Sequence, residues 1–565
     1  MQENQRKQQS FQYGAMILLC STMLVKIIGA IFKIPLSNLI GDLGFGYFSS
    51  AYDLFTPIYT LAMAGLPIAI SRIVAEHMAK ERYNDVRKSF KVTSKIFIVT
   101  GLVAMIIMLC FTPTFVENTD STGKTAYSIY AIVPALLVCC VTSAYRGYYE
   151  GLRNMYPTAF SDVIEALGKL VLGYGFAYVV LKTTNNVALS AAGAMFGITI
   201  GSVLAALFLI VRHKIKGDGI TEQELKSSPY PQKTSLIIKS VVLIAVPVVF
   251  ASLANSFSSL ADAFFVKNNL TDLMQNSADT IRNMYQASIT DYDLSQIERE
   301  LPVLSNNEIP TFLYGIRGKA FTLYNLVPAI TSVLGVSALP VLATAWTKKD
   351  NELIKKNIES PIKLTALISM PIGMGFVFLG DEIMNLIYST TASVEIGGTI
   401  LQIYGLAAIF AGISIPMTSM LQSVKREAFA FINIAIGAVI KVVVNYCLVS
   451  VPSINIKGAA LGTLACFFFV FVAHLITLII CTKVKPNLWK TILKPLIAAL
   501  ACGLSTVVLN LNSMGKIGTV IEIAVAAVVY FAVLIILNTF EADDVISLPK
   551  GDKILKIFKK LKIIR

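Results

Sequence analysis

Stretches of about 20 apolar residues recur along the whole chain, separated by short polar segments. Each stretch is long enough to cross the ~30 Å hydrocarbon core of a membrane as a helix. Apolar residues fill these stretches continuously and do not alternate with polar ones, as they would in the strands of a β-barrel. The pattern therefore predicts an all-α membrane protein with fourteen transmembrane helices. We place them at residues 13–34, 46–71, 96–113, 126–148, 158–181, 187–211, 237–264, 318–345, 361–380, 398–422, 428–450, 457–481, 491–511 and 517–538.

The polar segments alternate in charge. Lys and Arg gather after every second span, as in residues 80–91 and 212–233, whereas 114–125 and 381–397 contain few basic residues. Because basic loops stay on the cytoplasmic side, we expect a multi-pass protein of the plasma membrane with both termini in the cytoplasm. The net charge of +14 then reflects topology and contact with anionic lipids, and not nucleic-acid binding.

One polar segment is longer than the others. Residues 268–316 are rich in Asp and Glu, and the alternation places them outside the cell, either as a cap or gate or as a solvated insertion. The expected domains are an N-lobe at 1–211 with six spans, a cytoplasmic linker at 212–236, a C-lobe at 237–482 with six spans and the 268–316 insertion, two further spans at 483–540, and a basic cytoplasmic tail at 541–565.

The two predicted lobes are related by an internal repeat. Gly147–Tyr174 aligns without a gap with Ser419–Tyr446 at an offset of 272 residues, which places Arg153 on Lys425. Six spans separate the halves, so the lobes are expected to be pseudo-symmetric and to share one orientation in the membrane. Two-lobed membrane proteins of this kind commonly work by rocking around a central site.

Ionisable residues inside the predicted spans are the first candidates for a site. Placing one such charged side chain at the middle of a membrane helix costs about 2.5–3.5 kcal/mol on the lowest estimates. Each is therefore expected to face a partner or a water-filled cavity. Lys26 lies deep in its span and suits an anionic group, whereas Lys33 can also reach the membrane surface. The candidate cavity residues are Lys26, Lys33, Asp53, Asp162, Glu165, Lys169 and Lys441.

Some of these residues can also satisfy one another. Glu165 and Lys169 are four residues apart and can form an intrahelical pair, and Asp53 can pair with Lys26. Lys441, the repeat mate of Lys169, has Gly437 in place of a carboxylate four residues earlier, so we expect it to be freer to bind an anion.

Two weaker groups complete the candidates. Charges at the cytoplasmic span ends either form a gate between the lobes or anchor the helices; they are Arg72, Glu76, Arg146, Glu150 and Arg153. Asn255, Asp262 and Asn433 offer oxygen ligands for Na⁺, although hydrogen bonding between helices is the alternative use of the asparagines. The eight cysteines and three histidines show no metal-ligand spacing, and no phosphate-binding loop for ATP is present, so we expect no metal and no cofactor.

Three stretches carry a family resemblance: GDLGFGYFSSAYDLFTPIYTLAMAGLPIAISRIVAE at Gly41–Glu76, YRGYYEGLRNMYP at Tyr145–Pro157, and AITSVLGVSALPVLATAW at 329–346. They resemble the polysaccharide-transport branch of the multidrug/oligosaccharidyl-lipid/polysaccharide (MOP) exporter superfamily. Within it, the chain is most similar to the Gram-positive MurJ-type lipid II flippases and the stage V sporulation protein B group.

The resemblance implies a V-shaped pair of lobes around a central cavity that opens alternately to each side. It implies a cargo carried on undecaprenyl pyrophosphate, basic cavity residues from the first, second and eighth helices, and a lipid-tail groove at the last two. The motif VKIIGAIFK places Lys26 and Lys33 near the first-helix positions. The corresponding stretches Tyr52–Tyr59 and Tyr324–Val327 contain no basic residue.

The expected function is therefore that of a flippase for a lipid-linked cell-wall precursor, with lipid II as the first choice. Precursors of teichoic acid, capsule or spore cortex remain open, as does a drug/cation antiporter of the multidrug and toxin extrusion (MATE) type. An envelope enzyme is disfavoured because we find no nucleophile with a matching base. The expected partners are the lipid-linked anionic oligosaccharide, anionic lipids and the cell-wall synthesis machinery, with coupling to Na⁺, H⁺ or the membrane potential.

Overall fold

The computed structural model describes residues 11–63, 65–299, 301–388 and 390–539, and every regular element in these ranges is helical. The predicted basic tail at 541–565 lies outside the described residues, as does the side chain of Asn255. The chain divides into two compact units. The first contains Met1–Asn276 and Gln296–Gly315, and the second contains Ser277–Ser295 and Ile316–Arg565.

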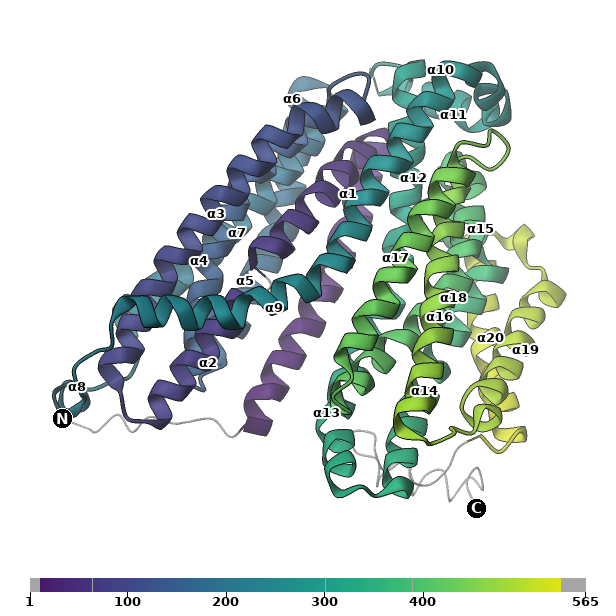
Figure 1. Ribbon diagram of the computed structural model, residues 1–565. Coiled ribbons are helices and arrows are strands. Elements are labelled where there is room, and N and C mark those ends of the chain that lie inside the picture. Colours follow the sequence, from purple (N-terminus) through teal and green to yellow (C-terminus); the bar gives the residue numbers. More distant parts are fainter. Residues whose placement is uncertain (1–10, 64, 300, 389, 540–565) are drawn as a thin grey trace. The chain divides into compact units, whose positions relative to one another are not determined.

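The first unit is a bundle of long helices in which α4 packs against both α3 and α7 (Figure 1). Its elements are α1 (Phe11–Met63), α2 (Leu66–Ala79), α3 (Tyr83–Thr119), α4 (Thr125–Gly151), α5 (Tyr156–Gly168), the π-helical turn η1 (Lys169–Gly173), α6 (Tyr174–Thr184), α7 (Val187–Lys216), α8 (Glu222–Ser227), α9 (Thr234–Ala261), the π-helical turn η2 (Asp262–Val266) and the start of α10 (Lys267–Met284).

Helix α1 contains most of the first two predicted spans. It breaks at Gly41, whose φ of 69° and ψ of −174° a side chain would disfavour. The break separates the predicted spans 13–34 and 46–71, and the second of these continues into α2. Pro35 and Pro57 lie within α1 without ending it.

Helix α9 corresponds to the seventh predicted span, and it bends along its length (Figure 1). Its first part, Thr234–Val246, is a short apolar segment. Ile237, Val241 and Ala245 from this part are buried in the core of the first unit, where α9 packs against α1, α2 and α3. This stretch therefore covers one side of the bundle.

The second unit is built around α16, which packs against α13, α14 and α18. Its elements include most of α11 (Gln286–Glu298), the part of α12 (Ile309–Tyr324) that follows Gly315, α13 (Leu326–Lys348), α14 (Asn351–Phe378), α15 (Gly380–Ile387), the π-helical turn η4 (Ser393–Gly397), α16 (Gly398–Ser423), α17 (Glu427–Val449), α18 (Lys457–Thr482), the π-helical turn η5 (Trp489–Leu493), α19 (Lys494–Leu509), the 3₁₀ turn η6 (Asn512–Met514) and α20 (Gly515–Ile536).

The predicted polar insertion, 268–316, is largely helical, and its last residues already belong to a longer helix. After α10, α11 and the 3₁₀ turn η3 (Asn306–Glu308), helix α12 begins at Ile309, so residues 309–316 extend a helix that the sequence started at 318. The predicted eighth span, 318–345, is also divided at Asn325 between α12 and α13. Pro328 lies in the first turn of α13, where its missing N–H leaves no helical hydrogen bond unmade.

Eleven helices in the described part of the chain are long and apolar enough to cross a membrane. One of these, Met16–Ala79, contains most of the first predicted span and all of the second. The structure thus agrees with a multi-pass all-α membrane protein, while the number of fourteen crossings stays a prediction.

Candidate functional site

Four charged side chains meet inside the first unit. The guanidinium of Arg146 on α4 donates to Asp162 Oδ1 and to Glu165 Oε2, both at 2.9 Å. Glu165 Oε1 lies 2.7 Å from the ammonium of Lys169. We call Arg146, Asp162, Glu165 and Lys169 the charge cluster. It combines residues that the sequence placed in two separate groups, because Arg146 was assigned to a cytoplasmic gate.

Hydroxyl groups hold the charge cluster in place. Arg146 Nε donates to Ser161 Oγ at 2.9 Å, and Ser202 Oγ on α7 donates to Glu165 Oε1 at 3.2 Å. Glu165 therefore receives hydrogen bonds from α4, α7 and the turn that follows its own helix. A buried carboxylate with this many donors is stabilised in its ionised form.

The local backbone brings these helices together. Lys169 begins the π-helical turn η1, and such turns within α-helices are frequent at functional sites. A Cβ added to Gly168 would lie 2.7 Å from the Cα of Gly201, and one added to Gly197 would overlap Gly173. Small residues at these contacts allow α5, η1 and α7 to pack backbone to backbone, as is common between membrane helices.

The two lysines of the first helix differ in their surroundings. Lys26 is exposed on α1. Lys33 is half-buried, and its ammonium lies 5.0 Å from the centre of the Tyr52 ring, which is within the range of a cation–π contact. Asp53 is also half-buried and accepts a 2.6 Å hydrogen bond from the hydroxyl of Tyr314 on α12.

Of the other predicted gate residues, Glu150 interacts electrostatically with Asp162 and Arg146 of the charge cluster, whereas three lie at the surface. Glu76 pairs with Lys80 on the surface at 2.6 Å, and Arg72 and Arg153 are exposed. Glu150 is half-buried near the end of α4. The structure thus brings Arg146 into the cluster and leaves Glu76 in a surface pair.

In the second unit, Lys441 is buried on α17, and its predicted availability for an anion stays a prediction. Asn433 donates to Thr477 Oγ1 at 3.1 Å, which is a hydrogen bond between α17 and α18. Asp262, in the first unit, is buried in the π-helical turn η2. No group of three His, Cys, Asp or Glu side chains with the geometry of a metal site occurs among the described residues.

Sequence reasoning missed two buried cations on α12. Arg317 donates from Nε to the hydroxyl of Tyr404 at 3.2 Å and lies over the Phe321 ring at 5.3 Å. Lys319 donates to Ser393 Oγ at 3.1 Å and lies 5.1 Å from the centre of the Tyr388 ring. The sequence analysis named neither residue, although Lys319 falls inside the predicted span 318–345 and Arg317 lies directly before it. The apolar stretch after Ile309 was the available signal.

The match to known families covers both halves of the chain. Residues 12–273 match the family described as polysaccharide biosynthesis protein, and residues 320–528 match the family described as lipid II flippase MurJ. Stage V sporulation protein B of Bacillus subtilis (strain 168) is 25% identical over 552 residues, which are 96% of this chain and 98% of that protein. The lipid II flippase MurJ of the same organism is 24% identical over 473 residues, 81% of each chain.

Solved structures agree in fold. A lipid II flippase MurJ in an inward closed conformation matches with a TM-score of 0.62 at 15% identity, covering 92% of this chain and 98% of that one. An inward-facing MATE family transporter of the MOP superfamily matches with a TM-score of 0.59 at 14% identity, covering 82% of this chain and 99% of that one.

Regions of this chain match the polysaccharide biosynthesis protein family and the lipid II flippase MurJ family, and together these regions cover most of its length. The resemblance read from the three sequence stretches is therefore confirmed. The similar proteins whose names state an activity are flippases and transporters, in agreement with a membrane transporter and not an enzyme. The similarity to flippases and transporters gives the buried charges of both units a context, because ionisable groups inside membrane segments are costly and commonly mark the paths of cargo or ions.

Proposed function

We propose that the protein is a flippase that moves an undecaprenyl-pyrophosphate-linked cell-wall precursor from the inner to the outer leaflet by alternating access. The observation that carries this proposal is the occurrence, in one chain, of a polysaccharide biosynthesis region and a lipid II flippase region. Lipid II is the first substrate to test. The similarity to a sporulation protein supports a spore-cortex precursor as the next, followed by teichoic-acid and capsule precursors.

The cationic side chains suit an anionic head group. Lys26 and Lys33 lie on α1, and Arg317, Lys319 and Lys441 lie in the second unit. A diphosphate binds strongly to ammonium and guanidinium groups in surroundings of low dielectric constant. In the proposed mechanism two pseudo-symmetric six-helix lobes line a V-shaped central cavity, and the head group moves through it while the prenyl tail stays in lipid.

The proposed arrangement in the membrane has fourteen crossings of the plasma membrane, cytoplasmic termini and an extracytoplasmic insertion. Helices α19 and α20 form the expected groove for the lipid tail. They pack against each other, and they leave large apolar side chains such as Val508, Val528 and Ile536 exposed. Surfaces of this kind favour contact with acyl or prenyl chains.

The proposed driving force is an ion gradient or the membrane potential. Moving one elementary charge through 100 mV is worth about 2.3 kcal/mol, which is enough to bias two conformations that differ by a similar amount. In the charge cluster, two cations balance two carboxylates. Loss or gain of one proton there would leave an uncompensated charge in the membrane.

The test is transport of defined undecaprenyl-pyrophosphate substrates by the purified protein in proteoliposomes. Lipid II and a teichoic-acid precursor are compared, each with and without an imposed potential. Lys26→Ala is expected to reduce transport at least tenfold, and Lys182→Ala, which removes an exposed lysine at the end of α6, is the matched control. Full transport by Lys26→Ala would remove Lys26 from the site, and no transport of any such lipid would contradict the proposal.

A second candidate function is export of a drug or organic cation, which the fold match to a MATE family transporter favours. The same vesicles can be loaded with a fluorescent organic cation. Exchange of this dye against Na⁺ or H⁺, without movement of lipid-linked sugars, would support the antiporter instead.

A further inference from the structure

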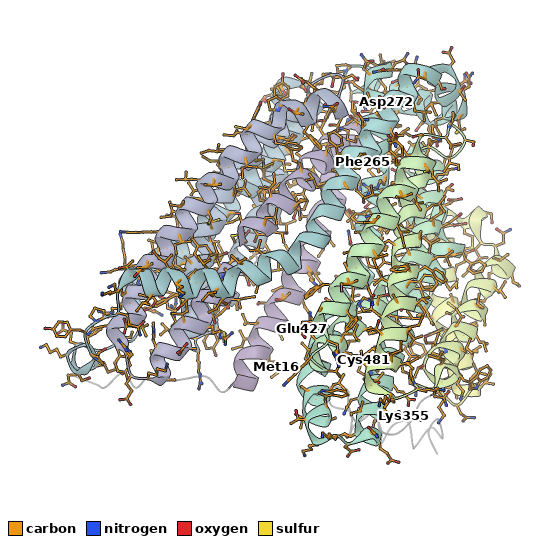
Figure 2. The ribbon with its side chains drawn as sticks, in the orientation of Figure 1. Met16, Phe265, Asp272, Lys355, Glu427 and Cys481 are labelled. Atoms are coloured by element: carbon orange, nitrogen blue, oxygen red, sulfur yellow. The ribbon has the colours of Figure 1, made fainter. Side chains whose placement is uncertain are left out.

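Lys267, the first residue of α10, is fully buried, with 0% of its surface exposed. Its ammonium nitrogen has no hydrogen-bond partner among the residues that the structure describes. Lysines are almost never buried completely unless they are paired, because the charged form loses its hydration. Phe265 and Asp272, which precede and follow Lys267 in the chain, mark this part of the first unit in Figure 2.

Two groups act on the buried ammonium. The ring of Tyr314 on α12 has its centre 6.0 Å from Nζ, and the Tyr314 hydroxyl is already bonded to Asp53. Asp120, at the end of α3, attracts Lys267 through its charge. Both carboxylate oxygens of Asp120 already accept hydrogen bonds of 2.6–3.1 Å from Thr122 and Thr125, so the loop holds this carboxylate in place.

The other charged groups near Lys267 are paired with different residues or lie on other turns of the chain. Lys124 and the hydroxyl of Tyr47 both donate to Glu308 Oε1, at 2.7 and 3.1 Å. Asp262 precedes Lys267 in the π-helical turn η2, and Asp272 is exposed further along α10. Lys124 is therefore paired with a carboxylate, whereas the ammonium of Lys267 has no hydrogen-bond acceptor among the described residues.

The chemistry of a buried amine follows from this geometry. Desolvation lowers the pKa of Lys267 from 10.5 to about 8, against the opposing attraction of Asp120. If water reached the side chain, its affinity for a proton would return towards the ordinary value. A group that binds protons more tightly in a hydrated arrangement than in a closed one links proton uptake to opening.

We propose that Lys267 is a proton-binding residue of this end of the first unit, which holds its proton more weakly when the end is closed than when it opens to water. This assigns a residue to the ion coupling of the transporter and, for its effect on flipping, rests on the proposed function. The proton is taken from solvent by the amine and returned to solvent on closing, with no other bond made or broken.

The direction of the pH effect follows from the proton affinities of Lys267 in the closed and the open arrangement. Well below pH 8 the amine is protonated in both arrangements, so the balance between open and closed does not change. As pH rises from about 8 to 10.5, Lys267 loses its proton in the closed arrangement while it is still protonated in the open one, so opening requires proton uptake and the closed arrangement gains. The open fraction is then expected to fall by on the order of 100-fold, which follows from the difference between the two pKa values.

The experiment measures opening without any substrate. Thr311, buried on α12 one turn before Tyr314, is replaced by Cys in a background in which the exposed Cys20, Cys110 and Cys447 are Ser. The rate of reaction with a methanethiosulfonate reagent is measured in detergent from pH 7 to 10.5. Each rate is divided by that of a Glu117→Cys protein, whose cysteine is exposed near the end of α3.

The normalised rate is expected to fall as pH rises, although a thiol alone reacts faster at higher pH. Lys267→Met should give a rate ratio that does not depend on pH, whereas Lys124→Met, the matched lysine control, should keep the fall. A flat ratio in the parent protein, or the same fall in Lys267→Met, would overturn the proposal. If Lys267→Met is not recovered as a single species by gel filtration, Lys267→Gln takes its place, and the parent titration remains decisive.

The two proposals can fail independently. A parent protein that shows the fall in thiol reactivity but flips no lipid-linked sugar contradicts the proposed function and keeps the proton site. A protein that flips lipid and shows a flat ratio keeps the function and removes Lys267 from its coupling.

Discussion

Arg153 and Lys425, which are 272 residues apart, share the same left-handed backbone conformation, with φ angles of 57° and 58°. Each follows the C-terminus of a long helix, α4 or α16. The amide of Arg153 donates to the carbonyl of Glu150, and that of Lys425 donates to the carbonyl of Gln422, both at 3.0 Å. The internal repeat thus extends from the sequence to the hydrogen bonds of the turn, which supports a common origin of the two halves.

This shared turn predicts parallel effects of substitution. A β-branched residue is disfavoured at positive φ, so Arg153→Val and Lys425→Val are each expected to lower stability by about 1–2 kcal/mol. Arg153→Gly and Lys425→Gly should be nearly neutral, because glycine adopts this conformation without strain. Thermal unfolding of the purified protein measures both pairs. Opposite outcomes at the two positions would show that the turns are not equivalent.

The charge cluster predicts a large and specific loss of stability. Glu165→Gln leaves Arg146 and Lys169 in a membrane helix bundle without the carboxylate that joins them, and breaking such a buried pair typically costs about 3–5 kcal/mol. Asp162→Asn removes a carboxylate paired with Arg146 alone and should cost less. The measurement is the denaturant or thermal midpoint of each variant in the same detergent.

A double variant separates charge from packing in the charge cluster. In Glu165→Gln/Lys169→Met the uncompensated ammonium is absent, so part of the lost stability should return. If the double variant is no more stable than Glu165→Gln, charge balance is not the reason for the loss.

Glu308 predicts a pH dependence at the end of the polar insertion. Burial raises the pKa of this carboxyl, but hydrogen bonds from Lys124 and Ser305 outweigh burial and hold it below its usual value of 4.5. The ionised carboxylate therefore stabilises the attachment above pH 4.5, and this contribution is lost as pH falls through the lower native pKa. Hydrogen exchange of residues 301–315 should be slow at pH 6 and, after correction for intrinsic rates, faster at pH 3.5.

A neutral variant tests the cause of this acid effect. Glu308→Gln should raise the exchange of the same segment about tenfold at pH 6, because charge-assisted hydrogen bonds are lost. Glu308→Gln should also remove most of the further rise in hydrogen exchange that the parent protein shows at low pH. An acid response of full size in Glu308→Gln would assign it to another group.

Much of the fold could be predicted from hydrophobic spacing, and the exceptions have physical causes. The long α3 and α7 lie where apolar runs predict them, because lipid requires continuous helices. The start of α12 at Ile309 was not predicted, and the buried cations Arg317 and Lys319 on this helix were not recognised, because the contacts that surround them come from segments distant in sequence. In the structure aromatic rings and hydroxyl groups surround them.

Only part of the candidate site could be predicted, because the sequence shows contacts within a helix but not contacts between helices. The pair of Glu165 and Lys169 follows from spacing on one helix. Contacts between helices do not, so Arg146 could be recognised as charged but not placed beside Glu165. The burial of Lys267 was equally invisible, because its neighbours Asp120 and Tyr314 are distant in sequence and no local pattern brings them together.

Close helix packing predicts which glycines are essential. A Cβ at Gly315 would overlap the carbonyl oxygen of Asp42, where α12 meets α1 within the first unit. Gly315→Ala is therefore expected to cost several kcal/mol or to prevent assembly, since two backbones would have to separate. Gly175→Ala, on an open face of α6, meets nothing within 4 Å and should be neutral or slightly stabilising. Equal yields and melting temperatures for the two variants would contradict this packing.

The proposed topology makes the polar insertion reachable from outside the cell. Thr290, on α11, is exposed and can be replaced by Cys in a background without the exposed native cysteines. An impermeant maleimide should label Thr290→Cys in intact cells. Glu224→Cys on α8, between the sixth and seventh predicted spans, should label only after lysis because that loop is basic and expected in the cytoplasm. Reversal of both results would invert the protein in the membrane, and labelling of both in intact cells would mean that the number of crossings between them is even.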